Sequence, residues 1–107
     1  MNIPQVIANL ITAQNEQNAV AYAECFAGTA IVHDEGKVHR GKVEIQQWIK
    51  DANEAYNSVM KPLNYEENGA ESLLTAEVNG TFPGSPALLK FHFIIEEQQI
   101  TSLKITS

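Results

Sequence analysis

The stretch that decides the fold is ALLKFHFIIEEQQITSLKIT, residues 87–106. Apolar and polar side chains alternate along Ala87–Glu96 and again along Ile100–Thr106, and a period of two predicts extended strands. The polar break Glu97–Gln99 is short enough for a tight connection, so the two strands are predicted to form an antiparallel hairpin.

The same period continues upstream of this hairpin, where Ser58–Glu66 and Ser72–Phe82 are predicted strands. Asn68 and Gly69 lie between them and predict a tight turn, because both central residues of the favoured hairpin turn need positive φ. The connection Phe82–Pro86 contains two prolines, which cannot donate to a central ladder, so we expect a loop there. Strands joined by consecutive hairpins predict an antiparallel meander.

The first half of the chain shows the helical period instead. The first predicted helix carries one apolar stripe, made by Ile3, Val6, Ile7, Leu10 and Ile11. Asn15 and Asn18 interrupt this stripe and are expected to cap a second, shorter helix that ends near Gly28. The apolar residues of this second helix are Ala19, Tyr22, Ala23 and Phe26. The stripe of a third helix is Ile45, Trp48, Ile49, Ala52 and Tyr56.

One strand and one turn are predicted between the second and third helices. Thr29–Asp34 is a β-branched and apolar run closed by Gly36, and Lys37–Gly41 is expected to be a turn. Because the helices gather toward the N-terminus and the strands come after them, the order predicts an α+β fold rather than βαβ units. A chain of 107 residues has the size of one ordinary domain, so a single domain over residues 1–107 is expected.

Charge and composition exclude several classes of partner. The formal net charge is −6 and the seven lysines and arginines are scattered singly, which leaves no basic stripe for nucleic acid. No apolar run approaches the roughly 18 residues that a membrane helix needs, and no signal-peptide pattern is present, so we expect a cytoplasmic protein. The one cysteine, Cys25, has no second thiol to pair with and is expected to be a small core residue.

The predicted strand Ala87–Glu96 has two unlike faces. Its Leu89, Phe91, Phe93 and Ile95 face is expected to meet the helices, whereas the opposite face is mixed. Leu73, Leu88 and Ile94 are expected on that outer face. A half-apolar outer sheet face on so small a domain predicts burial against a second copy, and therefore a homodimer.

The segment Cys25–Gly36 carries a resemblance to a known family. A helix ending in Phe-Ala leads into a strand with an acid, and a glycine-containing turn comes next. His39-Arg40-Gly41 then opens the third helix with its Ile45 and Trp48, as in SnoaL-like proteins. The chain thus resembles the SnoaL-like / nuclear-transport-factor-2-like group (NTF2-like, including the ketosteroid-isomerase-like proteins), with bacterial members of undefined function among the most similar.

The resemblance continues through Gly80–Pro86, Phe91–Phe93 and the closing Ile100–Ile105, and so covers nearly the whole chain. It implies a cone-shaped, cystatin-like α+β barrel in which three N-terminal helices pack on a strongly curved, mainly antiparallel sheet around a closed apolar pocket. It does not fix a function, because this fold carries isomerases, cyclases, hydrolases, dehydratases and plain binding modules.

Ketosteroid isomerases of this group carry an acid in a Phe-Ala-x-x-Ala-x-Val-x-Asp run that aligns with Phe26–Asp34 without a gap. The resemblance implies that Asp34 matches their general base, which removes a proton next to a carbonyl. Those enzymes meet the resulting enolate with a tyrosine and a protonated aspartate, whereas Leu10 and Leu89 stand at the aligned positions. Losing one such donor costs on the order of 10²–10³ in rate, so steroid isomerisation requires replacement donors here.

Asp34 is the predicted catalytic residue. If it shares a strand face with Val32 it points into the pocket, where desolvation raises the pKa of a carboxyl group. The alternative is that Asp34 caps the turn at Gly36 or pairs with Arg40. The predicted ligand-binding residues surround the same pocket and are Tyr22, Val32, Trp48, Tyr56, Leu89 and Phe91. The three histidines form no i, i+4 pair on a helix, so neither a metal site nor a cofactor is predicted.

The sequence therefore predicts a small-molecule pocket protein for a compact apolar ligand that bears a carbonyl or hydroxyl group. As an enzyme it would use Asp34 for a proton-transfer isomerisation, cyclisation or dehydration without a cofactor. The alternative is a non-catalytic ligand-binding or dimerisation module, which the missing donors favour. A pocket of roughly 300 Å³ or more in which Asp34 and a donor converge would favour chemistry.

Overall fold

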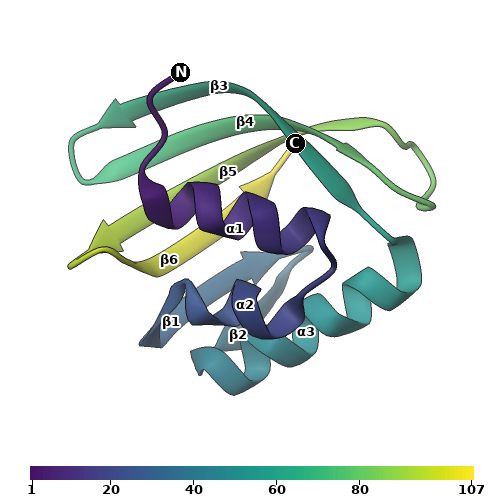
Figure 1. The fold of residues 1–107 in the computed structure, drawn as a ribbon, viewed down its shortest axis with the longest axis horizontal. Coiled ribbons are helices and arrows are strands. Elements are labelled where there is room, and N and C mark those ends of the chain that lie inside the picture. The colour runs from purple at the N-terminus through teal and green to yellow at the C-terminus, as the bar shows by residue number, and fades with distance from the viewer.

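The computed structural model describes residues 1–107 and contains three helices packed on one side of a curled six-stranded sheet (Figure 1). The helices are α1 (Gln5–Asn15), α2 (Ala19–Glu24) and α3 (Gly41–Tyr56). The strands are β1 (Phe26–Asp34), β2 (Lys37–Arg40), β3 (Val59–Asn68), β4 (Glu71–Asn79), β5 (Ala87–Glu96) and β6 (Gln99–Thr106). None of the helices is long and apolar enough to cross a membrane.

The sheet has the strand order β2-β1-β6-β5-β4-β3. Strands β3 to β6 form the predicted antiparallel meander, and β1 joins it by pairing in parallel with β6. The α+β fold with a mainly antiparallel sheet is therefore confirmed. The sheet curls around the helices, so that its concave face and the apolar helix stripes enclose the core (Figure 1).

The core is built largely from apolar residues that follow the helical period in the first half of the chain and the strand period in the second half. Ile7 and Leu10 of α1, Ile45 of α3 and Phe93 of β5 are fully buried. The side chain of Asn18 accepts a hydrogen bond from the backbone N–H of Ala21 and so caps α2, as predicted. The two periods thus indicate most of the apolar core, but Tyr56 of the predicted third stripe is exposed.

The boundary between α2 and β1 differs from the prediction. Phe26 was expected on the helix, but α2 ends at Glu24 and Phe26 is the first residue of β1, paired with Ile100. The Ile100 N–H donates to the Cys25 carbonyl at 3.0 Å, which draws the chain into the sheet before Gly28. A long-range backbone bond therefore ends the helix earlier than its apolar pattern indicates.

The segment Lys37–Arg40 was expected to be a turn, but it is strand β2. Asp34 pairs with Lys37, so that the turn contains only Glu35 and Gly36, whose φ angles are 52° and 75°. Turns with both central residues in the left-handed region match the twist of the strands they join. Four residues are too few to display a period of two, which explains why the sequence pattern missed this strand.

The β3–β4 hairpin turns one residue later than expected. Asn68 pairs with Glu71, and the turn consists of Gly69 and Ala70 with a positive φ only at Gly69. Strand β4 also ends at Asn79 rather than at Phe82. The Thr81 N–H donates to the carbonyl of Tyr56 at 2.8 Å, so the chain leaves the ladder to contact the end of α3.

Candidate functional site

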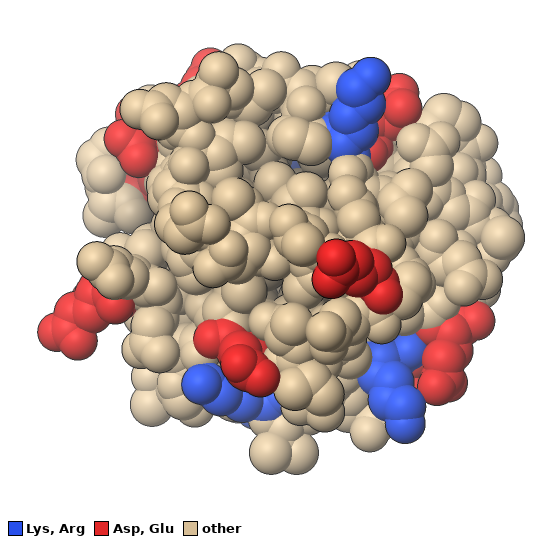
Figure 2. All heavy atoms as spheres, in the orientation of Figure 1, with Lys and Arg blue, Asp and Glu red and all other residues tan.

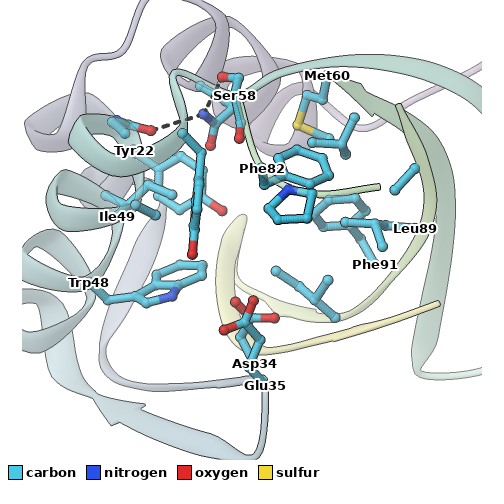
Figure 3. Close-up of a pocket in the computed structure, with 18 residues that line it drawn as sticks. Tyr22, Asp34, Glu35, Trp48, Ile49, Ser58, Met60, Phe82, Leu89 and Phe91 are labelled. Carbon is cyan, nitrogen blue, oxygen red and sulfur yellow. Dashed lines mark hydrogen bonds between the residues drawn. The ribbon is translucent and has the colours of Figure 1, made fainter. Parts of the chain in front are cut away.

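A cavity of about 420 Å³ lies between α3, α2 and the concave side of the sheet, and 12 of its 18 lining residues are hydrophobic (Figure 3). Phe91 and Leu89 of β5 form one wall, and Trp48 and Ile49 of α3 form the facing wall. The pocket was expected to be closed, but Tyr56 and other residues at its rim are exposed, because a turn and a loop border it. The cavity therefore has a mouth through which a small molecule can enter.

Six of the seven residues predicted for the site line this cavity: Asp34, Tyr22, Trp48, Tyr56, Leu89 and Phe91. Val32 does not. It shares the inward face of β1 with Asp34, but it is 0% exposed and packed within the core. The roles of the six residues in binding or catalysis stay predictions.

Asp34 is half-buried at the end of β1, and its carboxyl group points into the cavity beside that of Glu35 (Figure 3). Burial raises the pKa of Asp34 above its ordinary value of 3.8, and the negative charge of Glu35 raises it further. Interactions with the Trp48 side chain and with the Glu35 backbone N–H oppose this rise. A carboxylate with a raised pKa is a stronger base than a solvated one.

The ion pair with Arg40 that was considered for Asp34 is not formed. The structure contains one ion pair, between His92 and Glu71 on the other side of the sheet. The Arg40 backbone N–H instead donates its hydrogen bond to the side chain of Glu44 at 2.8 Å, which fixes the start of α3. Asp34 therefore has no cation to hold its carboxylate in a structural role.

Tyr22 of α2 provides a neutral donor near Asp34. Its side chain is 2% exposed and lines the cavity, and its ring contacts those of Phe26 and Trp48 at centroid distances of 5.7 and 6.0 Å. Burial, and then the charges of Asp34 and Cys25, raise the pKa of the Tyr22 hydroxyl above its ordinary value of 10.0. The hydroxyl therefore keeps its proton near neutral pH.

His39 of β2 supports the Trp48 side of the cavity. Its ring stacks on the indole at a centroid distance of 5.3 Å and an interplanar angle of 24°. Burial lowers the pKa of His39, and its Nε2 is buried without a hydrogen-bond partner. The sequence pattern placed His39 in a turn, because the four residues of β2 were too few to be recognised as a strand.

A polar cluster that sequence reasoning missed lies at the cavity end beside Ser58. Gln14 and Asn53 line the cavity and are each 7% exposed. Gln14 Nε2 donates to Asn53 Oδ1 at 3.0 Å and to the Ser58 carbonyl at 2.8 Å (Figure 3). The sequence carried a signal, because Gln14 continues the helical stripe of Ile7 and Leu10 and is therefore on the buried side of α1.

Charged groups are distributed thinly over the surface. On the face seen in Figure 2, the lysines and arginines are separated from one another and lie near acidic residues. No group of three or more histidine, cysteine, aspartate or glutamate side chains is placed to hold a metal ion. The cavity is accordingly the feature of this fold with the clearest chemistry.

No family model and no curated protein matches this sequence. Among solved structures, a protein from Sinorhizobium meliloti that was proposed to be a polyketide cyclase is 36% identical, with a TM-score of 0.93 over 97% of this chain and 95% of that chain. The chain belongs to the SnoaL-like, NTF2-like family. The resemblance seen in the sequence is thereby confirmed.

More distant structures share the fold of this SnoaL-like chain. A protein with a ketosteroid-isomerase-like fold from Catenulispora acidiphila, solved in complex with trimethylamine, is 19% identical with a TM-score of 0.85, covering 99% of this chain and 87% of that chain. The epoxide hydrolase/cyclase-like enzyme SalBIII, which acts in pyran ring formation in salinomycin, is 19% identical with a TM-score of 0.77, covering 94% and 86%. At these identities the likeness concerns the SnoaL-like fold alone.

Proposed function

We propose that this SnoaL-like protein is a cofactor-independent enzyme that transfers a proton on a small apolar carbonyl compound, with Asp34 as the acid and base. The observation that carries the proposal is the placement of Asp34 and the Tyr22 hydroxyl on one cavity of about 420 Å³. Isomerisation, cyclisation and dehydration all begin with such a proton transfer. The name given to the Sinorhizobium meliloti relative favours cyclisation among the three.

The residues suggest how the step would proceed. The Asp34 carboxylate takes a proton from the carbon next to the carbonyl, and the electron pair of that C–H bond moves onto the carbonyl oxygen. Tyr22 is neutral and buried, so its hydroxyl donates a hydrogen bond to the enolate oxygen. Protonated Asp34 then returns the proton to a second position on the substrate. In this scheme Tyr22 replaces the donors that are absent at Leu10 and Leu89.

The environment of Asp34 is suited to this task. Its raised pKa makes the carboxylate a better base than a solvated aspartate. The apolar walls exclude water from an enolate, which strengthens each hydrogen bond made to it. An exposed aspartate with an ordinary pKa would be the weaker base.

The experiment is deuterium exchange at the α-carbon of 2-tetralone, a compact apolar ketone, monitored by NMR in D₂O. We expect the wild-type protein to accelerate exchange and Asp34→Asn to lose about 10²–10⁴-fold of that acceleration, the range for a positioned base. Asp51→Asn is the matched control, because Asp51 is exposed on α3 and lies outside the cavity; it should stay within about threefold of wild type. Acceleration that survives in Asp34→Asn would sink the enzymatic proposal.

A non-catalytic binding module is the second candidate. It is favoured by Leu10 and Leu89, which stand at the positions where ketosteroid isomerases carry their two donors, with Leu10 0% exposed in the core. Under this alternative 2-tetralone binds to the cavity, but its α-protons exchange no faster than in buffer. The same experiment thus separates the two candidates.

We also propose that a second copy of the chain covers the outer face of the sheet. Leu88 is 61% exposed there, and Leu73 and Ile94 are half-buried. Charges of both signs are mixed on this face: Lys104 lies opposite His33 and His92, and Lys61 lies opposite Glu77. Glu71 pairs with His92 at 3.1 Å. A two-fold arrangement would set Leu88, Leu73 and Ile94 of each copy against the same face of the other.

A further inference from the structure

The end of the cavity far from Asp34 is polar and built from three elements. Gln14 of α1 and Asn53 of α3 are the two buried polar residues of the chain, and both line the cavity with Ser58. In Figure 3, Ser58 and the hydrogen bonds of this cluster lie at one end of the cavity, and Asp34 and Glu35 lie at the other. A ligand that fills the cavity therefore meets polar groups at both ends.

The hydrogen bonds of the cluster fix which atoms remain free. The Ser58 carbonyl can only accept, so the Gln14 atom 2.8 Å from it must be the amide nitrogen. The same nitrogen donates its second hydrogen to Asn53 Oδ1 at 3.0 Å. Gln14 Oε1 is then left as an acceptor without a protein donor, and Asn53 Nδ2 as a donor without a protein acceptor.

The free Gln14 oxygen is open to the cavity. The side-chain atoms that are sealed off without a partner are Gln17 Oε1 and His39 Nε2, and Gln14 Oε1 is not among them. Water can satisfy this oxygen while the cavity is empty of ligand. A ligand that displaces the water without offering a donor leaves the oxygen unpaired, which weakens its binding.

The framework around Gln14 is rigid. Gln17 Nε2 donates to the same Ser58 carbonyl at 2.7 Å, so Gln14 of α1 and Gln17 in the turn after α1 both bind the residue that precedes β3. Next to them, Asn15 exchanges two hydrogen bonds with the backbone of Met60, at 2.7 and 3.1 Å. The free acceptor and donor are thus held in place before a ligand arrives, as selective recognition requires.

We propose that Gln14 and Asn53 form a recognition point for a hydroxyl group, and that the ligand is a compact hydroxylated ketone. A hydroxyl group donates to Gln14 Oε1 and accepts from Asn53 Nδ2, whereas a ketone can only accept and an ammonium group can only donate. A carboxylate would face the Gln14 oxygen and share the cavity with Asp34 and Glu35. The assignment of a ketone group to the ligand depends on the proposed function, whereas the assignment of a hydroxyl group depends on the Gln14–Asn53 cluster alone.

The test compares the binding of 2-tetralone with that of its 6-hydroxy and 7-hydroxy derivatives and the matching methyl ethers, by calorimetry on the full chain. We expect at least one hydroxy derivative to bind about five- to tenfold more tightly than 2-tetralone, as one added neutral hydrogen bond gives. Its methyl ether, which cannot donate, should show no such gain. Equal binding of alcohol and ether, or no gain for either alcohol, overturns the proposal.

Two variants locate the effect. Gln14→Met should abolish the preference for the hydroxyl group. Gln47→Met should keep it, because Gln47 is exposed on α3, donates its hydrogen bond to Asp51 and does not line the cavity. If Gln14→Met does not fold, Asn53→Ala replaces it, with loss of the preference again expected. A preference that persists in a folded Gln14→Met or Asn53→Ala protein overturns the assignment.

The outcome is separate from that of the catalytic proposal. Binding is measured without turnover and can be repeated in Asp34→Asn. A preference for the alcohol without α-proton exchange supports the hydroxyl recognition point and contradicts only the role of Asp34 as a base. Exchange without a preference overturns the recognition point and leaves Asp34 in place.

Discussion

Asp34 is a carboxyl group whose surroundings disfavour its charge, with burial as the main cause and Glu35 as the second. No cation balances that charge, because the single ion pair of the structure lies elsewhere. The charge of Asp34 therefore lowers the stability of the native state. A neutral side chain of equal size at this position would make the fold more stable. Such a cost in stability is common where a residue serves function rather than folding.

Replacing Asp34 with asparagine is predicted to stabilise the fold in a pH-dependent way. The native pKa lies above the unfolded value near 3.8, so the native state binds more protons between the two values. Wild-type stability therefore falls, relative to Asp34→Asn, as pH rises through this window, and the difference levels off above the native pKa. Urea unfolding of both proteins from about pH 4 to 8 measures this.

Asp51→Asn on α3 is the control for this titration, because Asp51 is exposed and lies outside the cavity. We expect its free energy of unfolding to stay parallel to that of wild type. If Asp34→Asn instead destabilises the protein at every pH, Asp34 holds the β1–β2 turn and the base assignment loses its physical support.

Among single residues, the sequence identified the apolar and ionisable members of the cavity but not its amides. Trp48 and Phe91 stand out because period and size both mark them as inward-facing. Gln14 and Asn53 lie on the buried stripes of α1 and α3, but a glutamine or an asparagine ordinarily signals a solvated position. Their burial depends on mutual hydrogen bonds, which a linear pattern cannot display.

At the scale of elements, the turn between β1 and β2 places Asp34 at the cavity edge. Both of its residues, Glu35 and Gly36, adopt positive φ, and a side chain is disfavoured in that region. Strand β2 then pairs back along β1 and brings His39 against Trp48. This two-residue turn therefore positions Asp34, the proposed base, and also His39, which stacks on Trp48.

We predict that Gly36→Ala destabilises the protein by about 1–2 kcal/mol, the cost of left-handed backbone for a residue with a Cβ. The added methyl group itself meets open space, so the effect isolates backbone conformation. Gly28→Ala is the matched control, since Gly28 also has open space around it and no positive φ. Urea unfolding checks both, and an equal effect at the two glycines would contradict the turn geometry.

Helices α1 and α3 and strands β3 to β6 were predictable because each is long enough to show its period several times. The α2–β1 boundary and β2 were not. Strand β2 has four residues, and the end of α2 is set by a hydrogen bond between Ile100 and Cys25, which are far apart in the sequence. The local sequence pattern cannot indicate a hydrogen-bond partner that is so far away in the sequence.

At the scale of the whole molecule, the outer sheet face combines an exposed leucine with charged side chains of both signs. The proposed dimer would bury this face. We predict that the wild-type protein elutes with twice the 11.8 kDa mass of one chain in light-scattering chromatography. Leu88→Glu is expected to shift it to a monomer, because a carboxylate would then be buried at the interface.

Val43→Glu is the control for the dimer, since Val43 is 86% exposed on α3, away from the sheet face. It should leave the mass unchanged. A wild-type protein that is monomeric at about 0.1 mM, well above the Kd of a specific dimer, would rule out the proposed interface.

The α+β class could be inferred from the order of the two periods, but the topology could be inferred only in part. Hairpins are local and can be inferred from turns, whereas the parallel pairing of β1 with β6 joins segments that are far apart in the sequence. That pairing curls the sheet around the helices and thereby creates the cavity. The parallel pairing of β1 with β6, which shapes the site, was therefore the feature that the local sequence pattern indicated least.

Strand β6 lies in the middle of the sheet, between β1 and β5, although it comes after all other strands in the chain. On the ribosome, the edges of β1 and β5 must wait unpaired until residues 99–106 have left the exit tunnel. Until then the apolar inner face has no complete sheet to cover it, and a stalled or shortened nascent chain presents open strand edges to its neighbours. The sheet is thus incomplete until its central strand is available, and a nascent chain without β6 is expected to be prone to aggregation.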